Sequence, residues 1–226
     1  MKEEDIDVAK APLNDQQQHW EKMLTANAEM FGMEPSFPAR KAAELFKQEG
    51  ARAILELGSG QGRDTLFFVR EGFQVHALDY SHEGVEIIRG KADALGLSQA
   101  VNALQHDVRQ PLPSDDRSFD ACYSHMLYCM ALTTNELESI SKEIWRVLKP
   151  GGLNIYTVRT ATDKHYGAGT HRGEDMWEVG GFIVHFFSRE KVGHLAKGYD
   201  VISIEEFEEG DLPRKLFLVT LRKTKG

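Results

Sequence analysis

The chain has 226 residues, a mass of 25.5 kDa and a formal net charge of −8. Its apolar share of 41% is enough for a folded core, which excludes a wholly disordered protein, and its length suits one α/β domain. The acidic residues are spread along the chain, and no basic stripe is present to meet the phosphates of a nucleic acid. No apolar run approaches the ~20 residues that cross a bilayer. We therefore expect neither a nucleic-acid partner nor a membrane segment.

The first residues and the cysteines indicate a compartment. Residues 1–13 are rich in charge and contain a proline, which favours a disordered N-terminus, and they show no signal peptide. Cys122 and Cys129 do not form a C-x-x-C pair and lie among apolar residues, so buried reduced thiols are expected rather than a disulfide or a metal site. These features predict a cytoplasmic protein.

The expected elements alternate between helix and strand in the rhythm of a mostly parallel sheet. Helices are expected at residues 16–31, 40–48, 63–71, 82–96, 134–148 and 188–197, and strands at 52–57, 73–79, 101–105, 118–123 and 152–158. Residues 200–207 and 214–222 alternate like the two strands of a β-hairpin. Residues 159–187 are polar and glycine-rich, which predicts an irregular lid or substrate-binding insertion in a single domain that covers residues 14–226.

The glycine-rich run after the first expected strand is the most informative segment. Residues 53–57 are apolar apart from Glu56, and the run continues as Gly58-Ser59-Gly60-Gln61-Gly62 before a helix. Glycine permits a tight turn and lets a ligand approach the backbone, while the helix start offers unpaired N–H groups. A strand, a glycine turn and a helix in this order are typical of a nucleotide-type binding site.

Two carboxylates follow on the next expected strands. Asp79 ends the strand at 73–79, where it can accept both hydroxyl protons of a ribose. The alternative role, capping the next helix, suits Ser81 better. Asp107 ends the third strand, and an exposed loop aspartate before Pro111 is its alternative interpretation. A Leu148-Lys149-Pro150-Gly151-Gly152 run then precedes the strand at 152–158.

These segments together resemble the class I S-adenosylmethionine-dependent methyltransferases. The resemblance covers residues 50–158 best, and Gly62-Arg63-Asp64-Thr65 is loosely similar to the thiopurine and tellurite-resistance methyltransferases. It implies a Rossmann-like, mostly parallel seven-stranded sheet flanked by helices and closed by a C-terminal antiparallel hairpin. It also implies an N-terminal helical cap, residues 14–49, over the cofactor. The cofactor would be S-adenosyl-L-methionine, and the product S-adenosyl-L-homocysteine.

The resemblance also implies a set of binding residues. The residues expected to hold the cofactor are Glu56, Gly58, Ser59, Gly60, Gly62, Asp79, Tyr80, Asp107, Val108 and Ser124. Asp107 would take the adenine amino group, and the N–H of Val108 a ring nitrogen. Trp20 would belong to the cap, although simple packing against the sheet explains it almost as well. Trp20, His125, Tyr128 and Arg159 are candidates for substrate binding.

A catalytic base is harder to assign. His125, Tyr128 and His185 are candidates, but a soft anionic acceptor needs no base. For His125 a local hydrogen bond is an equal alternative, and for Arg159 so is pairing with an acidic residue of the lid. Asp120 is expected to hold a loop backbone. The histidines do not show zinc spacing, so no metal is expected.

The predicted function is methyl transfer to a small-molecule acceptor by in-line displacement. A non-catalytic S-adenosylmethionine-binding module remains an alternative, because binding motifs do not prove turnover. An NAD-dependent oxidoreductase is less favoured, since no tyrosine has a lysine four residues later, and a P-loop is absent. The sequence gives neither the acceptor atom nor a choice between a monomer and a homodimer.

Overall fold

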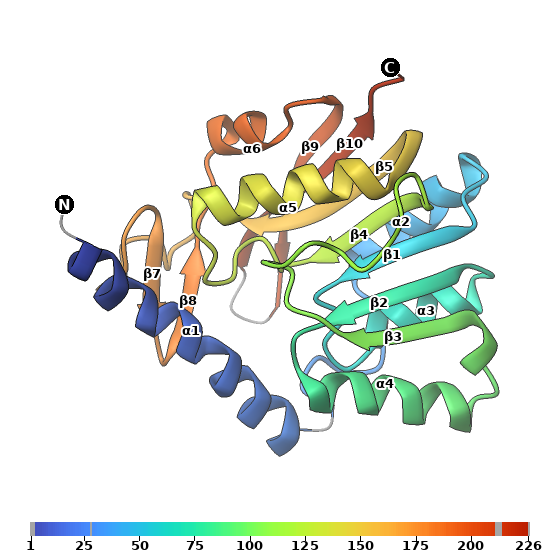
Figure 1. Ribbon diagram of the computed structural model, residues 1–226, viewed down its shortest axis with the longest axis horizontal. Coiled ribbons are helices and arrows are strands. Elements are labelled where there is room, and N and C mark those ends of the chain that lie inside the picture. The colour runs from blue at the N-terminus through green and yellow to red at the C-terminus, as the bar shows by residue number, and fades with distance from the viewer. Residues whose placement is uncertain (1–2, 28, 211–213, 226) are drawn as a thin grey trace.

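In a computed structural model, the chain is a seven-stranded sheet with helices on both faces (Figure 1). The structure describes residues 3–27, 29–210 and 214–225, with side chains from residue 15 onward. The helices are α1 (Glu3–Ala26), α2 (Phe37–Gln48), α3 (Arg63–Arg70), α4 (His82–Ala94), α5 (Thr134–Val147) and α6 (Arg189–Leu195). The strands of the large sheet are β1 (Ala53–Leu57), β2 (Gln74–Asp79), β3 (Val101–Gln105), β4 (Phe119–His125), β5 (Leu148–Arg159), β9 (Tyr199–Glu209) and β10 (Arg214–Lys223).

The strand order confirms the expected fold class. The sheet runs β3-β2-β1-β4-β5-β10-β9, with β3, β2, β1, β4 and β5 parallel to one another and β10 antiparallel to both β5 and β9. The order reverses between β1 and β4, because β2 and β3 lie to one side of β1 and the later strands to the other. In an open parallel sheet, ligands bind outside the carboxyl ends of the strands at such a switch point.

Two buried clusters fix the helices to the sheet. One joins α5 and α6 to residues such as Leu57, Leu78 and Val158. The other joins α2, α3 and α4 to residues such as Ile54 and Val75. Alternate residues of the central strands therefore point to opposite helical layers, which explains why β1 is buried along nearly its whole length.

Local signals set the helix ends. Ser81 caps α4 by accepting a hydrogen bond from Gly84 N at 2.9 Å, as predicted. Thr133 and Glu136 form a capping box at the start of α5, and Ser188 caps α6. Asp120 accepts hydrogen bonds from the backbone N–H groups of Arg52 and Ala53, both at 2.9 Å, so its expected role in holding a loop backbone is confirmed.

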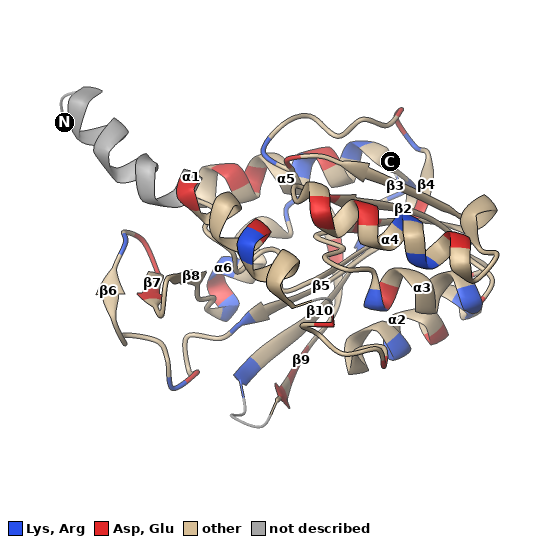
Figure 2. Ribbon diagram, turned by 90° about the horizontal axis from the view of Figure 1, so that it is seen from below, with Lys and Arg blue, Asp and Glu red and all other residues tan. Residues whose placement is uncertain are grey.

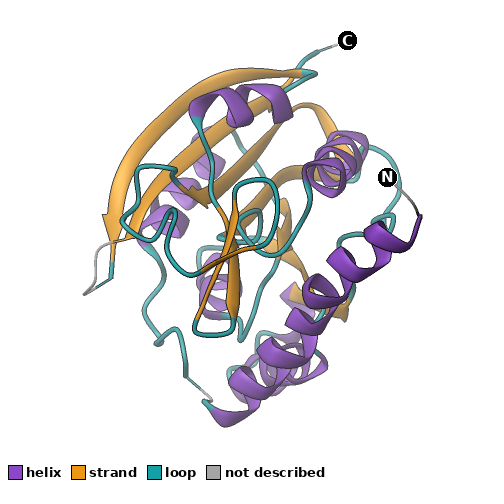
Figure 3. Cartoon of the chain, turned by 90° about the vertical axis from the view of Figure 1, so that its left-hand side faces the viewer, coloured by secondary structure: helices purple, strands orange, loops and turns teal. Residues whose placement is uncertain are grey.

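Two segments differ from the sequence expectations. The backbone of α1 is helical through residues 3–13, where disorder was expected; a helix already nucleated downstream extends at little cost per residue. The segment 159–187 is not irregular but contains the antiparallel strands β6 (Thr170–His171), β7 (Met176–Val179) and β8 (Phe182–His185). Figure 3 shows α1 beside the β7–β8 hairpin. No helix of the described chain is long and apolar enough to cross a membrane.

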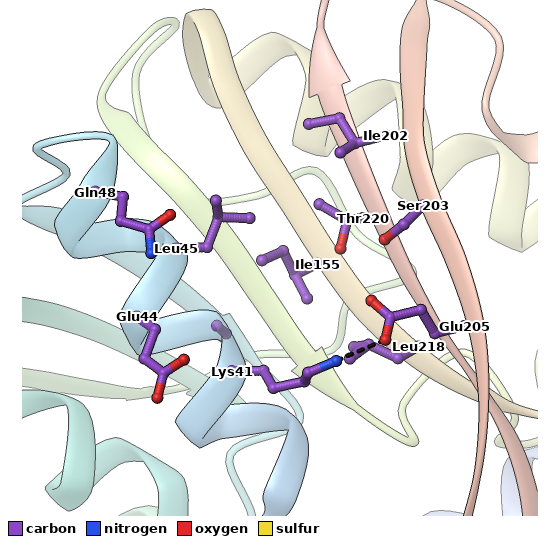
Figure 4. A pocket seen from close by; sticks show the side chains of 11 residues that line it. Lys41, Glu44, Leu45, Gln48, Ile155, Ile202, Ser203, Glu205, Leu218 and Thr220 are labelled. Atoms are coloured by element: carbon purple, nitrogen blue, oxygen red, sulfur yellow. Dashed lines mark hydrogen bonds and ion pairs between the residues drawn. The ribbon is translucent and has the colours of Figure 1, made fainter.

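Charges of both signs are interspersed over the described helices (Figure 2). A hollow of about 220 Å³ lies between α2 and the strands β5, β10 and β9 (Figure 4). Its lining includes Leu45, Ile155 and Leu218, together with Lys41 and Glu205, which form an ion pair at 2.6 Å. None of the expected cofactor residues lines this hollow.

Candidate functional site

The glycine turn after β1 has the backbone conformation that its sequence predicts. Gly58, Gly60 and Gly62 have φ values of +70°, +54° and +81°, which side chains other than glycine rarely adopt. A Cβ atom on Gly62 would lie 2.6 Å from a side-chain atom of Ile88, so glycine also lets α3 approach α4. The helix α3 therefore begins at this turn, which lies at the carboxyl edge of the sheet where the strand order reverses.

Asp79 lies directly against this turn. Its Oδ2 accepts a hydrogen bond from Gly60 N at 2.7 Å, and its Oδ1 accepts one from Ser81 N at 2.9 Å. Burial raises the pKa of Asp79, and the two N–H groups oppose that rise by stabilising the carboxylate. The carboxylate is therefore fixed in orientation before any ligand binds.

Glu56 is buried below the turn. Thr65 donates a 2.6 Å hydrogen bond to its Oε2, and the residue is 3% exposed. Burial, reinforced by the charge of Asp64, raises the pKa of Glu56 to about 8. Its side chain therefore supports the turn from within.

Asp107 already has a partner. Its two carboxylate oxygens accept hydrogen bonds from the Arg109 guanidinium at 2.6 to 3.0 Å. Burial alone would raise the pKa of Asp107, but the bonds from Arg109 outweigh it and lower the pKa. Val108 is partly buried against the core, and Tyr80 is half-buried with its carbonyl accepting from Gln17 and Gln105.

Three polar atoms at the carboxyl ends of β1, β3 and β4 are buried and have no hydrogen-bond partner among the described residues. They are Ser59 Oγ, Ser124 Oγ and His106 Nε2. A buried polar group without a partner costs stability unless a ligand or water satisfies it. Ser59 and Ser124 were both expected at the cofactor, whereas His106 was not singled out. The bare glycine turn, the fixed Asp79 carboxylate and these unsatisfied atoms fit a nucleoside ligand with many polar groups.

His125 ends β4 beside this edge, but both its ring nitrogens are engaged. Nδ1 lies 2.8 Å from Thr157 Oγ1, and Nε2 lies 3.2 Å from Glu209 Oε2. Burial would raise the pKa of Glu209, but His125 and nearby arginines bring it below its usual value. The next residue, Met126, has a φ of +64° and donates its N–H to Thr157, a strained conformation of the kind that collects at binding sites.

Two of the candidate bases are buried. Tyr128 is 0% exposed and stacks on Tyr156 with ring centroids 4.3 Å apart, so it belongs to the core, where burial raises its pKa. His185 is also 0% exposed; its Nδ1 lies 2.6 Å from the carbonyl of Leu132, and its Nε2 contacts Lys191. Burial, followed by the charge of Lys191, lowers the pKa of His185.

Arg159 is likewise buried and paired. Its guanidinium donates to Asp163 at 2.6 and 3.1 Å, and its side chain is 6% exposed. The expected clamp on a substrate carboxylate is thus replaced by the alternative, pairing with a lid acid. Burial would raise the pKa of Asp163, but the bonds from Arg159 and two backbone N–H groups lower it.

The N-terminal segment is tied to the turn through Gln61, a residue that sequence reasoning did not single out. The Gln61 amide donates to the carbonyls of Leu24 and Asn27, at 3.0 and 2.6 Å, and accepts from Met30 N at 3.1 Å. Its place inside the glycine run was the available signal. Glu209, by contrast, reaches His125 from the far hairpin, and no local pattern announces that contact.

The strand order is that of a Rossmann-like domain, and comparisons with known proteins show what the chain is similar to. Residues 54–152 match the family model described as a methyltransferase domain. Over these residues the chain is similar to the methyltransferases of that family, and the match covers less than half of its length. No group of three or more potential metal ligands occurs in the described part of the chain.

Curated relatives described as methyltransferases match part of the chain. An uncharacterized methyltransferase of Mycobacterium tuberculosis is 32% identical over 140 residues, which cover 62% of this chain and 52% of that protein. A putative methyltransferase of Bacillus subtilis is 31% identical over 111 residues, covering 48% and 42%. The chain thus spans about half the length of such curated relatives.

Solved structures share the fold. A methyltransferase from Methanosarcina mazei superposes with a TM-score of 0.69 at 21% identity, covering 77% of this chain and 93% of that one. The 1,6-didemethyltoxoflavin N1-methyltransferase of Burkholderia thailandensis gives a TM-score of 0.67 at 15% identity, covering 99% and 91%.

Proposed function

We propose that this protein transfers the methyl group of S-adenosyl-L-methionine to a small-molecule acceptor by direct in-line displacement. The observation that carries the proposal is the hydrogen bond between Gly60 and Asp79, which joins the glycine turn to a carboxylate at the tip of the next strand. In this proposal Asp79 accepts the ribose hydroxyls and the backbone of Gly58 and Gly60 lies against the ligand. Glu56 and Gly62 shape the turn from below.

The remaining cofactor assignments follow the geometry. Ser59 and Ser124 would give their unsatisfied hydroxyls to the ligand, and His106 joins the set on the same ground. Tyr80, Asp107 and Val108 would meet the adenine, with Asp107 sharing its oxygens between the ligand and Arg109.

The bound sulfonium would supply an activated methyl group, and the protein would orient the two reactants and exclude water from them. None of the three candidate bases presents an unengaged ring nitrogen or an exposed hydroxyl, as described above. The protein's own contribution is therefore to hold the acceptor in line, to exclude water under α1 and the β7–β8 hairpin, and to release the methylated product.

A small acceptor suits the charge of the chain. One relative is a tRNA methyltransferase and another a phosphatidylethanolamine N-methyltransferase, while the Burkholderia neighbour was solved with bound 1,6-didemethyltoxoflavin. A net charge of −8 disfavours a polyanion such as tRNA. The buried free thiols of Cys122 and Cys129 support the proposed cytoplasmic location. Either a monomer or a homodimer is compatible with this function.

The test has two stages. Isothermal titration of the protein with S-adenosylmethionine, S-adenosylhomocysteine and NAD should show binding of the first two only. Release of S-adenosylhomocysteine is then measured over a panel of small hydroxyl, amine and thiol acceptors, with tRNA and phosphatidylethanolamine vesicles included. Tight NAD binding would overturn the cofactor assignment, and cofactor binding without turnover on any acceptor would favour the non-catalytic module.

A further inference from the structure

Three aromatic side chains from separate elements meet beside the glycine turn. Trp20 lies on α1, Phe31 on the loop before α2, and Phe182 on β8. The Trp20 ring centroid is 4.9 Å from that of Phe182 and 6.4 Å from that of Phe31. We call these three residues the aromatic wall.

The wall begins at the turn itself. A Cβ atom built on Gly60 would lie 3.4 Å from the Phe31 ring, so this ring directly adjoins the backbone of the turn. Phe31 is nevertheless 41% exposed, and Trp20 and Phe182 are half-buried. An apolar ring surface therefore remains available next to the proposed methyl donor.

Specific contacts hold the wall together. The Gln16 amide donates to the carbonyl of Gly181 at 2.9 Å and accepts from Ile183 N at 3.1 Å, so it bonds to the hairpin turn and to β8. A Cβ on Gly181 would lie 3.1 Å from the His19 ring, and only a bare backbone lets α1 come this close. Figure 3 shows the helix and the hairpin side by side.

The wall lies on a different side of α1 from the proposed adenosine contacts. Gln17 donates to the carbonyl of Tyr80, and Glu21 accepts from Glu83 N at the start of α4. Gln16, His19 and Trp20 instead contact β8 and its turn. The helix α1 thus presents polar side chains toward Tyr80 and the start of α4, and aromatic side chains toward the β7–β8 hairpin.

We propose that the aromatic wall binds a flat aromatic ring carried by the methyl acceptor. This inference rests on the proposed function and adds the chemical class of its substrate. Aromatic rings stack in offset or edge-to-face contacts that a puckered ring of equal size does not make. The wall also supplies apolar area that displaces water from the transfer site.

Two probes of the same carbon skeleton test the proposal: 2-naphthol, which is flat, and decahydro-2-naphthol, which is puckered. Each is titrated by calorimetry into the whole protein, with and without saturating S-adenosylhomocysteine. We expect 2-naphthol to bind roughly tenfold more tightly, both with and without the product. Equal affinities for the two probes would overturn the proposal. Competition between 2-naphthol and S-adenosylhomocysteine would also overturn it, because the wall would then belong to the cofactor site.

Substitutions assign the effect to the wall. Trp20→Leu and Phe31→Leu should each remove most of the preference for 2-naphthol; Phe31 is exposed, so its variant is expected to fold. Trp145→Leu is the matched control, because that residue lies on α5 and bonds to Gly198 instead. A preference kept in both wall variants contradicts the inference. If the unmodified protein does not bind S-adenosylhomocysteine, the proposed function is contradicted instead. The titration of 2-naphthol without S-adenosylhomocysteine tests the aromatic wall independently of that result.

Discussion

The backbone N–H of Gly60 donates a 2.7 Å hydrogen bond to the carboxylate of Asp79, although the two residues belong to different strand–helix connections. The contact orders the glycine turn and the carboxylate together, so a ligand that binds one meets the other already in place.

Replacing Asp79 should therefore weaken cofactor binding. In Asp79→Ala the ribose hydroxyls lose a charged acceptor and Gly60 loses its partner, a loss of about 1.5–3 kcal/mol. Calorimetry with S-adenosylhomocysteine measures the change, circular dichroism confirms folding, and Asp115→Ala on an exposed loop is the control. Unchanged affinity in a folded variant would refute the ribose assignment.

Glu56 should make stability depend on pH. Its pKa of about 8 in the folded protein exceeds the usual 4.5, so it keeps its proton on folding. The contribution of Glu56 to the free energy of unfolding is fully present below its pKa in the unfolded state. It is lost as pH rises through its pKa of about 8 in the folded state. Urea unfolding from about pH 5 to about pH 9 should show a smaller decline in Glu56→Gln than in the unmodified protein. Glu208→Gln, on exposed β9, should decline like the unmodified protein; if Glu56→Gln does so too, the assignment fails.

Arg159 should matter for stability. In Arg159→Met the carboxylate of Asp163 remains buried without its cation, which should cost about 3–5 kcal/mol of unfolding free energy. Arg189→Met breaks an exposed pair with Glu206 and should cost about 1 kcal/mol or less. Thermal and urea unfolding of both variants test this. A stable Arg159→Met protein that binds its acceptor poorly would restore the substrate-clamp interpretation.

Gly181 should control how firmly α1 is held. Gly180 and Gly181 both have positive φ, +60° and +83°, so alanine is strained at either position. Only Gly181→Ala also pushes into His19, whereas nothing lies within 4 Å of a Cβ on Gly180. Hydrogen exchange over residues 15–24 should therefore be faster in Gly181→Ala than in Gly180→Ala. Equal rates would show that this contact does not hold the helix.

The parts of the fold that depend on neighbouring residues were predictable. Burial on both faces makes β1 apolar at every position except Glu56, Ser81 marks the start of α4, and glycine positions mark the turn. The strand at the end of which Asp79 lies could be found for the same reason. Such features follow from short-range rules that operate within a few residues.

Contacts between distant segments were not predictable in this way. Tyr128 is a residue type that can bind substrates or transfer protons, but its ring packs on that of Tyr156 from β5. His125 meets Glu209 from the C-terminal hairpin. The three strands of segment 159–187 also escaped prediction, because they are short and pair only with one another.

The open edge of the sheet has a consequence for handling the protein. β9 is an 11-residue edge strand with exposed Val201 and Ile202 and several glutamates, including Glu205, Glu206 and Glu208. Two molecules that paired along this edge would bring like charges together, and their repulsion disfavours edge-to-edge pairing of the exposed strand. Neutralising these carboxylates with acid, or screening them with concentrated salt, should weaken this repulsion. Light scattering under both conditions should then detect aggregation.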